Sequence, residues 1–280
     1  MMQSAGLSLR ALPSRKVWTA HYCLLTACWA TYSLGLAVIV QLIAGPQKDI
    51  FLAINQWAAA HTPQFWASVT LLGHTGVLMC CMSPLLVYRP KAMMSFVAAI
   101  PAGALSSVVL KHSFSALRPS DLLSPVDFNN IGLFLSGNSF PSGHTITAFA
   151  AAAAVCASLD VRPGRVRYVV ITASLALASL VGVSRMAVGA HWPTDVVAGA
   201  GLGWLAGLSG VWLCERFTAW WQRSSAQVLV LLALAAFTIE AHQSVAASGG
   251  AVWVVWLASA SLVSTLVLMA QQLRHPVTGV

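Results

Sequence analysis

The stretch that decides the fold is residues 196–214, VVAGAGLGWLAGLSGVWLC, which contains no charged side chain. Crossing a hydrocarbon core of roughly 30 Å takes about 20 apolar helical residues. Gly199, Gly203 and Gly207 recur at every fourth position and therefore share one helix face, where a second helix can approach closely. The stretch predicts a transmembrane helix that packs tightly against a neighbour.

Similar apolar runs occur along the whole chain, which has 58% hydrophobic and 8% charged residues and a mean hydropathy of +0.77. This composition excludes an ordinary soluble protein. The candidate spans are residues 18–44, 65–88, 93–110, 143–159, 168–183, 196–214, 228–241 and 252–270. The first is too long for a signal-peptide core, so we expect it to be retained as an anchor. We predict an all-α, polytopic transmembrane bundle that forms a single integral membrane domain over residues 1–280, because the ten-residue alternation of barrel strands is missing from the sequence.

Basic residues predict the orientation, because lysine and arginine concentrate in short cytoplasmic loops. Both termini are expected to be cytoplasmic, which places these residues inside: Arg10, Arg15, Lys16, Arg89, Lys91, Arg162, Arg165, Arg167, Arg216, Arg223 and Arg274. Lys48, Lys111, Arg118 and Arg185 are then left outside. The net charge of +8 and the pI near 9.6 follow mostly from this bias, so we do not expect nucleic-acid binding.

Three polar segments fall where the third to sixth predicted spans meet the outer face. They read KHSFSALRP at residues 111–119, FPSGH at residues 140–144, and Ser184-Arg185 followed by His191 and Asp195. Together they supply the candidate site residues.

Lys111, Arg118 and Arg185 would bring positive charges together at the edge of a low-dielectric medium, which is costly unless an anion neutralises them. Arginine offers paired donors to phosphate oxygens, and lysine a compact charge. A lone cation here would more simply be an interfacial side chain whose head reaches water. Three of them beside two histidines indicate a phosphate site.

Ser142 and Gly143 stand at the expected start of a helix, where free amide hydrogens point toward a bound anion. Glycine permits close backbone approach, and the Ser142 hydroxyl adds a donor. The same serine is also suited to simple helix capping, which is compatible with phosphate binding.

His191 precedes Pro193, a residue suited to a first helical turn, so Asp195 lies one turn further on and can reach the imidazole. A carboxylate there would fix the tautomer and raise the basicity of the other ring nitrogen, as a nucleophile requires. His144 is then free to protonate the leaving oxygen and later to take a proton from water. The histidines that match no motif are expected to be polar interface residues: His21, His61, His74, His242 and His275.

We expect no metal and no cofactor. Asp49, Asp121 and Asp127 lack the spacing of a recognised metal cage. The cysteines lie in or at the ends of predicted spans, without zinc-like pairing, and behave there as small apolar side chains: Cys23, Cys28, Cys80, Cys81, Cys156 and Cys214.

The three segments together resemble the signature motifs of the type 2 phosphatidic acid phosphatase superfamily, whose members include bacterial undecaprenyl-diphosphate and phosphatidylglycerophosphate phosphatases. The resemblance matches every signature position between Lys111 and Asp195. It implies a phosphatase core of six helices, whose catalytic part covers about residues 65–214, with a phosphohistidine formed on His191 at one membrane surface. Two extra C-terminal helices, about residues 225–272, depart from the family pattern.

The function implied is a membrane lipid phosphatase that hydrolyses a lipid phosphate monoester or diphosphate, with undecaprenyl diphosphate as the leading substrate by analogy. An alternative passes the phosphate to a second lipid, such as lipid A. An alternative of another class is a non-catalytic headgroup-binding protein or transporter, although binding alone does not need His144 and His191 together. A soluble haloperoxidase shares a related site, but here the surrounding helices are membrane spans. We expect a bacterial inner membrane with the site facing outward, and the sequence does not specify the oligomeric state.

Overall fold

The computed structural model describes residues 15–44, 47–132, 135–159, 164–221, 229–239 and 252–274. Within these ranges the chain forms helices and loops and no strand, so the all-α prediction is confirmed. Arg10, Arg162, Arg223, His242 and His275 lie outside the described residues.

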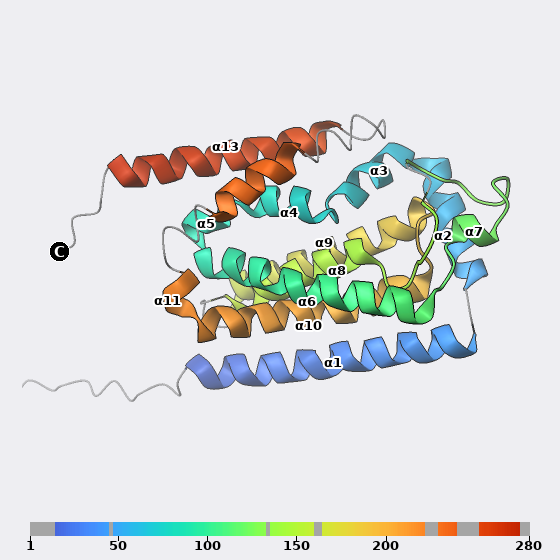
Figure 1. Ribbon diagram of the computed structural model, residues 1–280, viewed down its shortest axis with the longest axis horizontal. Coiled ribbons are helices and arrows are strands. Elements are labelled where there is room, and N and C mark those ends of the chain that lie inside the picture. The colour runs from blue at the N-terminus through green and yellow to red at the C-terminus, as the bar shows by residue number, and fades with distance from the viewer. Residues whose placement is uncertain are drawn as a thin grey trace, which may run out of the picture.

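Four helices form the centre of an elongated bundle (Figure 1): α6 (Pro90–Phe114), α8 (Gly143–Ala157), α9 (Arg165–Ala187) and α10 (Pro193–Arg216). α1 (Arg15–Ile43) lies along α10 at one side. A β-carbon on Gly203 would lie 2.3 Å from the Ile146 carbonyl oxygen, and one on Gly207 2.5 Å from that of Ala150. The glycine face of α10 therefore packs directly on the backbone of α8, as its spacing predicts.

The second predicted span is not one continuous helix. It divides into α3 (Pro63–Leu71) and α4 (Thr75–Met82), bent by 76°, and continues into α5 (Leu85–Tyr88). At the break, a β-carbon on Gly73 would lie 2.7 Å from that of His144. The chain thus uses glycine to bring its broken segment against the start of α8.

The eight predicted spans each overlap a described helix. Among the described residues, five helices are long and apolar enough to cross a membrane, and the α3–α4 pair makes a sixth if it is taken as one span. Two shorter apolar helices, Gly143–Ala157 and Leu229–Ile239, occupy the fourth and seventh predicted spans. The protein is an integral membrane protein.

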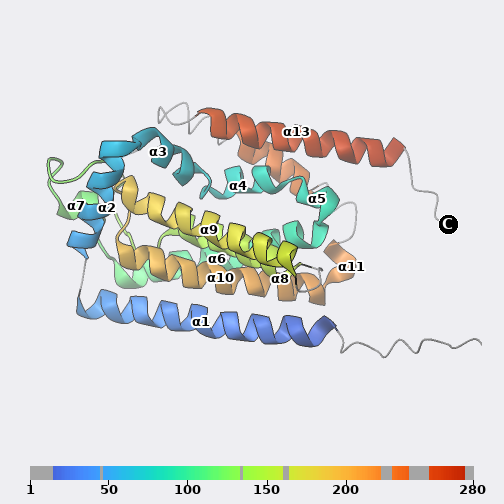
Figure 2. The same cartoon turned by 180° about the vertical axis from the view of Figure 1, so that it is seen from behind.

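The C-terminal part lies on the opposite side of the bundle from α1. Figure 2 shows α13 (Val252–Arg274) beyond α4 and α5 when the molecule is seen from behind. The Cys80 thiol lies 3.4 Å from the Leu234 carbonyl oxygen, and the hydroxyls of Ser83 and Thr265 are 2.9 Å apart. These contacts fasten the C-terminal helices to the broken span.

The two ends of the bundle differ. α2 (Lys48–His61) and the short α7 (Pro119–Leu122) cover one end. The other end holds α11 (Thr218–Trp221) and an exposed ion pair in which Lys91 Nζ lies 2.6 Å from Glu215 Oε1.

Candidate active site

The candidate site lies at the end of the bundle that α2 and α7 cover. There α6 ends, α8 begins, α9 ends and α10 begins, so the three polar segments meet although they are distant in sequence (Figure 1). Of the expected site residues, Arg118, Ser142, Arg185, His191 and Asp195 are all buried.

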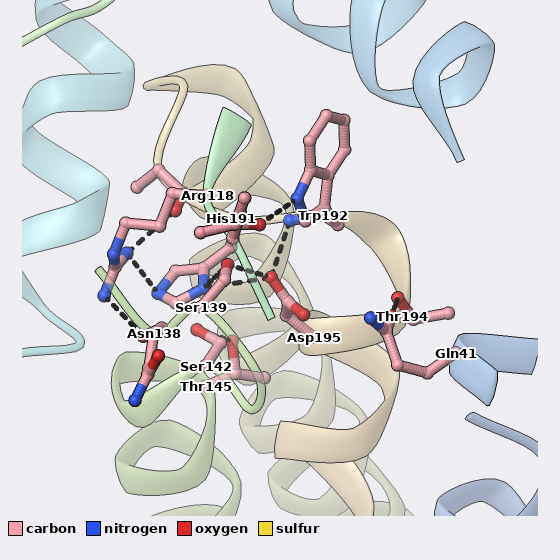
Figure 3. Close-up of polar contacts among 12 residues, drawn as sticks. Gln41, Arg118, Asn138, Ser139, Ser142, Thr145, His191, Trp192, Thr194 and Asp195 are labelled. Carbon is pink, nitrogen blue, oxygen red and sulfur yellow. Dashed lines mark hydrogen bonds and ion pairs between the residues drawn. The ribbon is translucent and has the colours of Figure 1, made fainter. Parts of the chain in front are cut away.

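His191 and Asp195 contact each other across the first turn of α10. His191 Nδ1 lies 3.2 Å from Asp195 Oδ2, and the same oxygen accepts a hydrogen bond of 2.8 Å from the Trp192 backbone N–H (Figure 3). Pro193 starts the helix, as expected from its fixed φ and its missing N–H. The Asp195 carboxylate is therefore fixed by a backbone N–H and in turn orients the His191 imidazole.

Ser139 is a site residue that the sequence did not identify. Its hydroxyl donates to Asp195 Oδ2 and lies 3.2 Å from His191 Nδ1, while its backbone N–H donates to the Ala116 carbonyl at 2.7 Å. A serine in a polar loop carries no periodic signal, and its position just before the FPSGH segment was the one available indication.

Arg118 lies on the other side of the imidazole. Its Nη1 donates to the Ala190 carbonyl at 2.9 Å and lies 3.3 Å from His191 Nε2, and its Nη2 donates to the Asn138 carbonyl at 3.3 Å (Figure 3). Because guanidinium can only donate, His191 Nε2 is the acceptor and its proton is on Nδ1, facing Asp195. The lone pair of Nε2 thus points into the cationic part of the site.

The two arginines keep donors unused. Arg185 Nη1 donates to the Thr70 hydroxyl, yet the buried Nε atoms of Arg185 and Arg118 have no hydrogen-bond partner among the described residues. Lys111, half-buried at the end of α6, interacts electrostatically with Arg118, Arg185 and Asp195. Buried donors without partners favour an anionic ligand that would satisfy them.

The environment of His191 keeps its imidazole neutral. Burial, followed by the cations Arg185, Arg118 and Lys111, lowers the pKa of His191 well below the ordinary 6.5. The sequence suggested that Asp195 would make the ring more basic. In the structure the carboxylate orients the ring, while burial and the cations decide its protonation.

Ser142 immediately precedes α8, but it does not cap the helix. Its hydroxyl makes no bond to a helix amide and instead accepts a hydrogen bond of 3.0 Å from the Thr145 hydroxyl. Its backbone N–H donates to the Asp195 carbonyl at 3.0 Å, which joins the start of α8 to the start of α10. Gly143 begins the helix, so the amides of the first turn have no acceptor within α8.

His144 is the second residue of α8 and lies against the break between α3 and α4. Its ring centroid is 6.3 Å from that of His74, and the buried Nδ1 of His74 has no partner in the described part of the chain. Sequence reasoning treated His74 as an interface residue of no special role. Its proximity to His144 depends on the break, which hydropathy does not reveal.

Asp121, one of the acidic residues considered as a metal ligand in the sequence, has a structural role instead. Asp121 Oδ2 accepts hydrogen bonds of 3.1 Å from the backbone N–H groups of Arg118 and Gly137. Asp121 therefore fixes the segment that carries Arg118. Across the described ranges, no three His, Cys, Asp or Glu side chains gather in a group that could hold a metal ion.

Residues 91–220 match the PAP2 superfamily. A lipid A 1-phosphatase from Porphyromonas gingivalis is 36% identical over 106 residues, which cover 38% of this chain and 20% of that protein. An undecaprenyl-diphosphatase from Sulfolobus acidocaldarius is 28% identical over 188 residues, covering 62% of this chain and 84% of that protein. A lipid A 1-phosphatase from Rhizobium etli is 35% identical over 134 residues, which cover 44% of this chain and 54% of that protein.

Two solved structures share the fold. LpxE from Aquifex aeolicus has a TM-score of 0.50 and 28% identity, covering 58% of this chain and 93% of that chain. A transmembrane PAP2-type phosphatidylglycerolphosphate phosphatase from Bacillus subtilis has a TM-score of 0.51 and 23% identity, covering 67% of this chain and 94% of that chain. The second likeness concerns the fold alone. Over residues 91–220, a little under half of its length, this chain with its membrane helices is therefore similar to the PAP2 superfamily.

Proposed function

We propose that this protein is a membrane lipid phosphatase that works through a phosphohistidine on His191. The observation that carries the proposal is the state of His191: Nδ1 faces Asp195 and Ser139, and Nε2 faces Arg118 with its lone pair available. A neutral, oriented imidazole next to buried guanidinium donors is suited to attack phosphorus.

In the first step, Lys111, Arg118 and Arg185 bind the phosphoryl oxygens together with Ser142 and the amides at Gly143. His191 Nε2 attacks phosphorus, the bond from phosphorus to the lipid oxygen breaks, and His144 gives that oxygen its proton. The cations and helix amides stabilise the charge on the five-coordinate phosphorus. We propose a metal-independent reaction on this basis.

In the second step, His144 takes a proton from a water molecule, whose oxygen attacks the phosphorus of the phosphohistidine. The bond between phosphorus and His191 Nε2 breaks, and inorganic phosphate and the starting enzyme result. Asp195 keeps the proton on Nδ1 throughout, because it stabilises that tautomer and the positive charge that develops on the ring.

We propose undecaprenyl diphosphate as the physiological lipid. The names of the relatives support two substrates, lipid A 1-phosphate and undecaprenyl diphosphate. A second candidate reaction keeps the phosphohistidine but transfers phosphate to another lipid, such as lipid A. A non-catalytic headgroup-binding protein or transporter would use the cations without needing His144 and His191.

We also propose a bacterial inner membrane as the location, with the site facing the periplasm or the cell exterior. The support is the distribution of charge. Lys91, Arg165, Arg167 and Arg216 belong to helix ends opposite the candidate site. The proposed partners are the bilayer and a phosphorylated lipid, without nucleic acid.

The test is phosphate release by the purified full-length protein from undecaprenyl diphosphate, phosphatidylglycerophosphate, phosphatidate and lipid A 1-phosphate. Inorganic phosphate should appear without an added lipid acceptor. Transfer to a second lipid with no free phosphate would establish the transferase instead. Binding of these lipids without either product would establish a non-catalytic protein.

Rapid-quench trapping with a labelled aryl phosphate assigns the two histidines. His191→Ala should lose the acid-labile phosphoenzyme, and His144→Ala should still form it because a good leaving group needs little protonation. Label retained in His191→Ala and lost in His144→Ala would exchange the two roles.

A further inference from the structure

A cavity of about 360 Å³ opens beside His144, among α4, α6, α8 and the helix Leu229–Ile239. His74 and His144 are among the residues that line it, and Phe96, Ile100 and Phe237 are among its apolar lining residues. We call this cavity the leaving-group chamber.

The place of the chamber relative to the chemistry follows from the proposed function, on which this inference rests. His144 is the proposed proton donor to the leaving oxygen, so the leaving group lies on its side of phosphorus. The chamber is lined by His144 and not by His191. Whatever departs with the leaving oxygen therefore occupies this space.

Polar groups in the chamber are few. The hydroxyls of Thr75 and Thr147 lie 3.0 Å apart, and one donates a hydrogen bond to the other. The buried Nδ1 of His74 remains without a partner among the described residues, 6.3 Å between ring centroids from His144. A buried donor or acceptor without a partner, next to His144, favours a polar group of a ligand that would satisfy it.

The C-terminal segment completes the chamber. Phe237 packs on Gly76, where a β-carbon would lie 2.7 Å from Phe237 Cβ. The thiol of Cys80 lies 3.0 Å from the Thr238 hydroxyl and 3.4 Å from the Leu234 carbonyl oxygen, which holds this helix on α4. One wall is thus supplied by helices outside the part that matches the family, residues 91–220.

We propose that the chamber selects the lipid: His74 contacts the polar atoms next to the scissile bond, and an apolar chain passes along Phe237. The volume is about a dozen times the roughly 30 Å³ that a water-sized group occupies, enough for the first part of one chain. A sugar leaving group, as in lipid A 1-phosphate, would place several hydroxyls against walls that are mostly apolar, in which the polar side chains are His74, Thr75, Ser107, His144 and Thr147. A polyprenyl diphosphate is the substrate class that fits, with His74 on its second phosphate.

The first experiment changes the wall. Phe237→Trp and Phe237→Ala are compared with Leu232→Ala, an exposed leucine on the same helix, as a matched control. For each, kcat/KM is measured for geranylgeranyl diphosphate, lipid A 1-phosphate and p-nitrophenyl phosphate. Phe237→Trp should lower kcat/KM for geranylgeranyl diphosphate, relative to kcat/KM for p-nitrophenyl phosphate, by about tenfold or more. Phe237→Ala should lower the preference for geranylgeranyl diphosphate over lipid A 1-phosphate, while Leu232→Ala keeps both ratios.

The second experiment changes the polar contact. His74→Ala should raise KM for geranylgeranyl diphosphate about tenfold, and His74→Gln, which retains a donor, should recover part of the loss. His112→Ala is the control, because His112 is exposed and bonded at 2.8 Å to the Val108 carbonyl of its own helix.

The outcomes separate the two proposals. If the unaltered protein releases no phosphate from any lipid, the proposed function fails. If it is active, but the Phe237 and His74 variants keep the substrate ratios and KM of the unaltered protein within about twofold, the leaving-group chamber is wrongly assigned. Gel filtration in detergent identifies any variant that has lost its fold. If one does, the second substitution at the same position, Phe237 or His74, still tests the assignment.

Discussion

The imidazole of His191 is held at both nitrogens by groups from three different segments. Asp195 and Ser139 lie at Nδ1, and Arg118 lies at Nε2. Orientation by neighbours fixed in this way lowers the reorganisation that a nucleophile needs when substrate binds. Ser139 is consequently a positioning residue in the proposed reaction.

Ser139→Ala removes one donor to Asp195 and one contact to the ring. A hydrogen bond to a charged group contributes about 1.5–3 kcal/mol, so phosphohistidine formation should slow by roughly tenfold or more. Asp195→Asn should cost more, because the tautomer is then no longer enforced. Single-turnover kinetics measure both, with Ser136→Ala, exposed in the same loop, as the control. An unchanged rate in Ser139→Ala would leave the serine a purely structural role.

The depressed pKa of His191 predicts the acid side of the pH profile. Since burial and the cations lower this pKa, the neutral nucleophile persists to a pH below the ordinary 6.5 and is lost only on further acidification. Arg118→Gln removes one of the cations, so the acid limb of kcat/KM should move to higher pH. Comparing the two proteins on the same substrate cancels the titration of the substrate itself. A limb that moves to lower pH, or does not move, would contradict this account of His191.

At the scale of elements, hydropathy and spacing predicted the positions of the helices, and the glycines of α10 predicted its tight packing on α8. The motifs predicted which helix ends meet. The break at Gly73 was missed: the run Gly-His-Thr-Gly at residues 73–76 interrupts the apolar stretch 65–88, but how the chain bends there depends on the tertiary contact with His144. His74 and Ser139 were missed for the same reason: their roles exist only through tertiary contacts.

Asn55 connects α2 to the site end of the bundle. This fully buried side chain accepts a 2.7 Å hydrogen bond from the Asn129 N–H and donates to the carbonyls of Asn129 at 2.8 Å and Ala187 at 3.0 Å. Asn55→Leu leaves these backbone groups unpaired, at about 1–3 kcal/mol each. The Tm in detergent should fall by roughly 5 °C or more. Gln56→Leu on the exposed face, where the contact to Asp127 is 3.5 Å, should change it little. Equal Tm values for the two variants would refute the connecting role.

For the whole molecule, the proposed orientation places the end that α2 and α7 cover outside the cell. Cysteines introduced at Ser120 and Ser136 should then react with an impermeant thiol reagent in intact cells. A cysteine at Phe217, exposed beyond α10 at the other end, should react only after the membrane is opened. The reverse labelling pattern would invert the orientation and place the site in the cytoplasm.

The backbone hydrogen bond from Ser142 to Asp195 joins the proposed anion-binding start of α8 to the first turn of α10, next to the proposed nucleophile His191. A β-carbon on Gly199 would lie 2.8 Å from the Ser142 carbonyl oxygen, so the two helices cannot slide at this point. The proposed site is consequently aligned before any lipid binds. We therefore expect the slow steps of turnover to be the entry of the lipid from the viscous bilayer and its return to it. Turnover should therefore depend on membrane fluidity. At one temperature, kcat for a long-chain lipid substrate should be higher in fluid bilayers than in gel-phase bilayers. As the control, kcat for a water-soluble aryl phosphate should be the same in both.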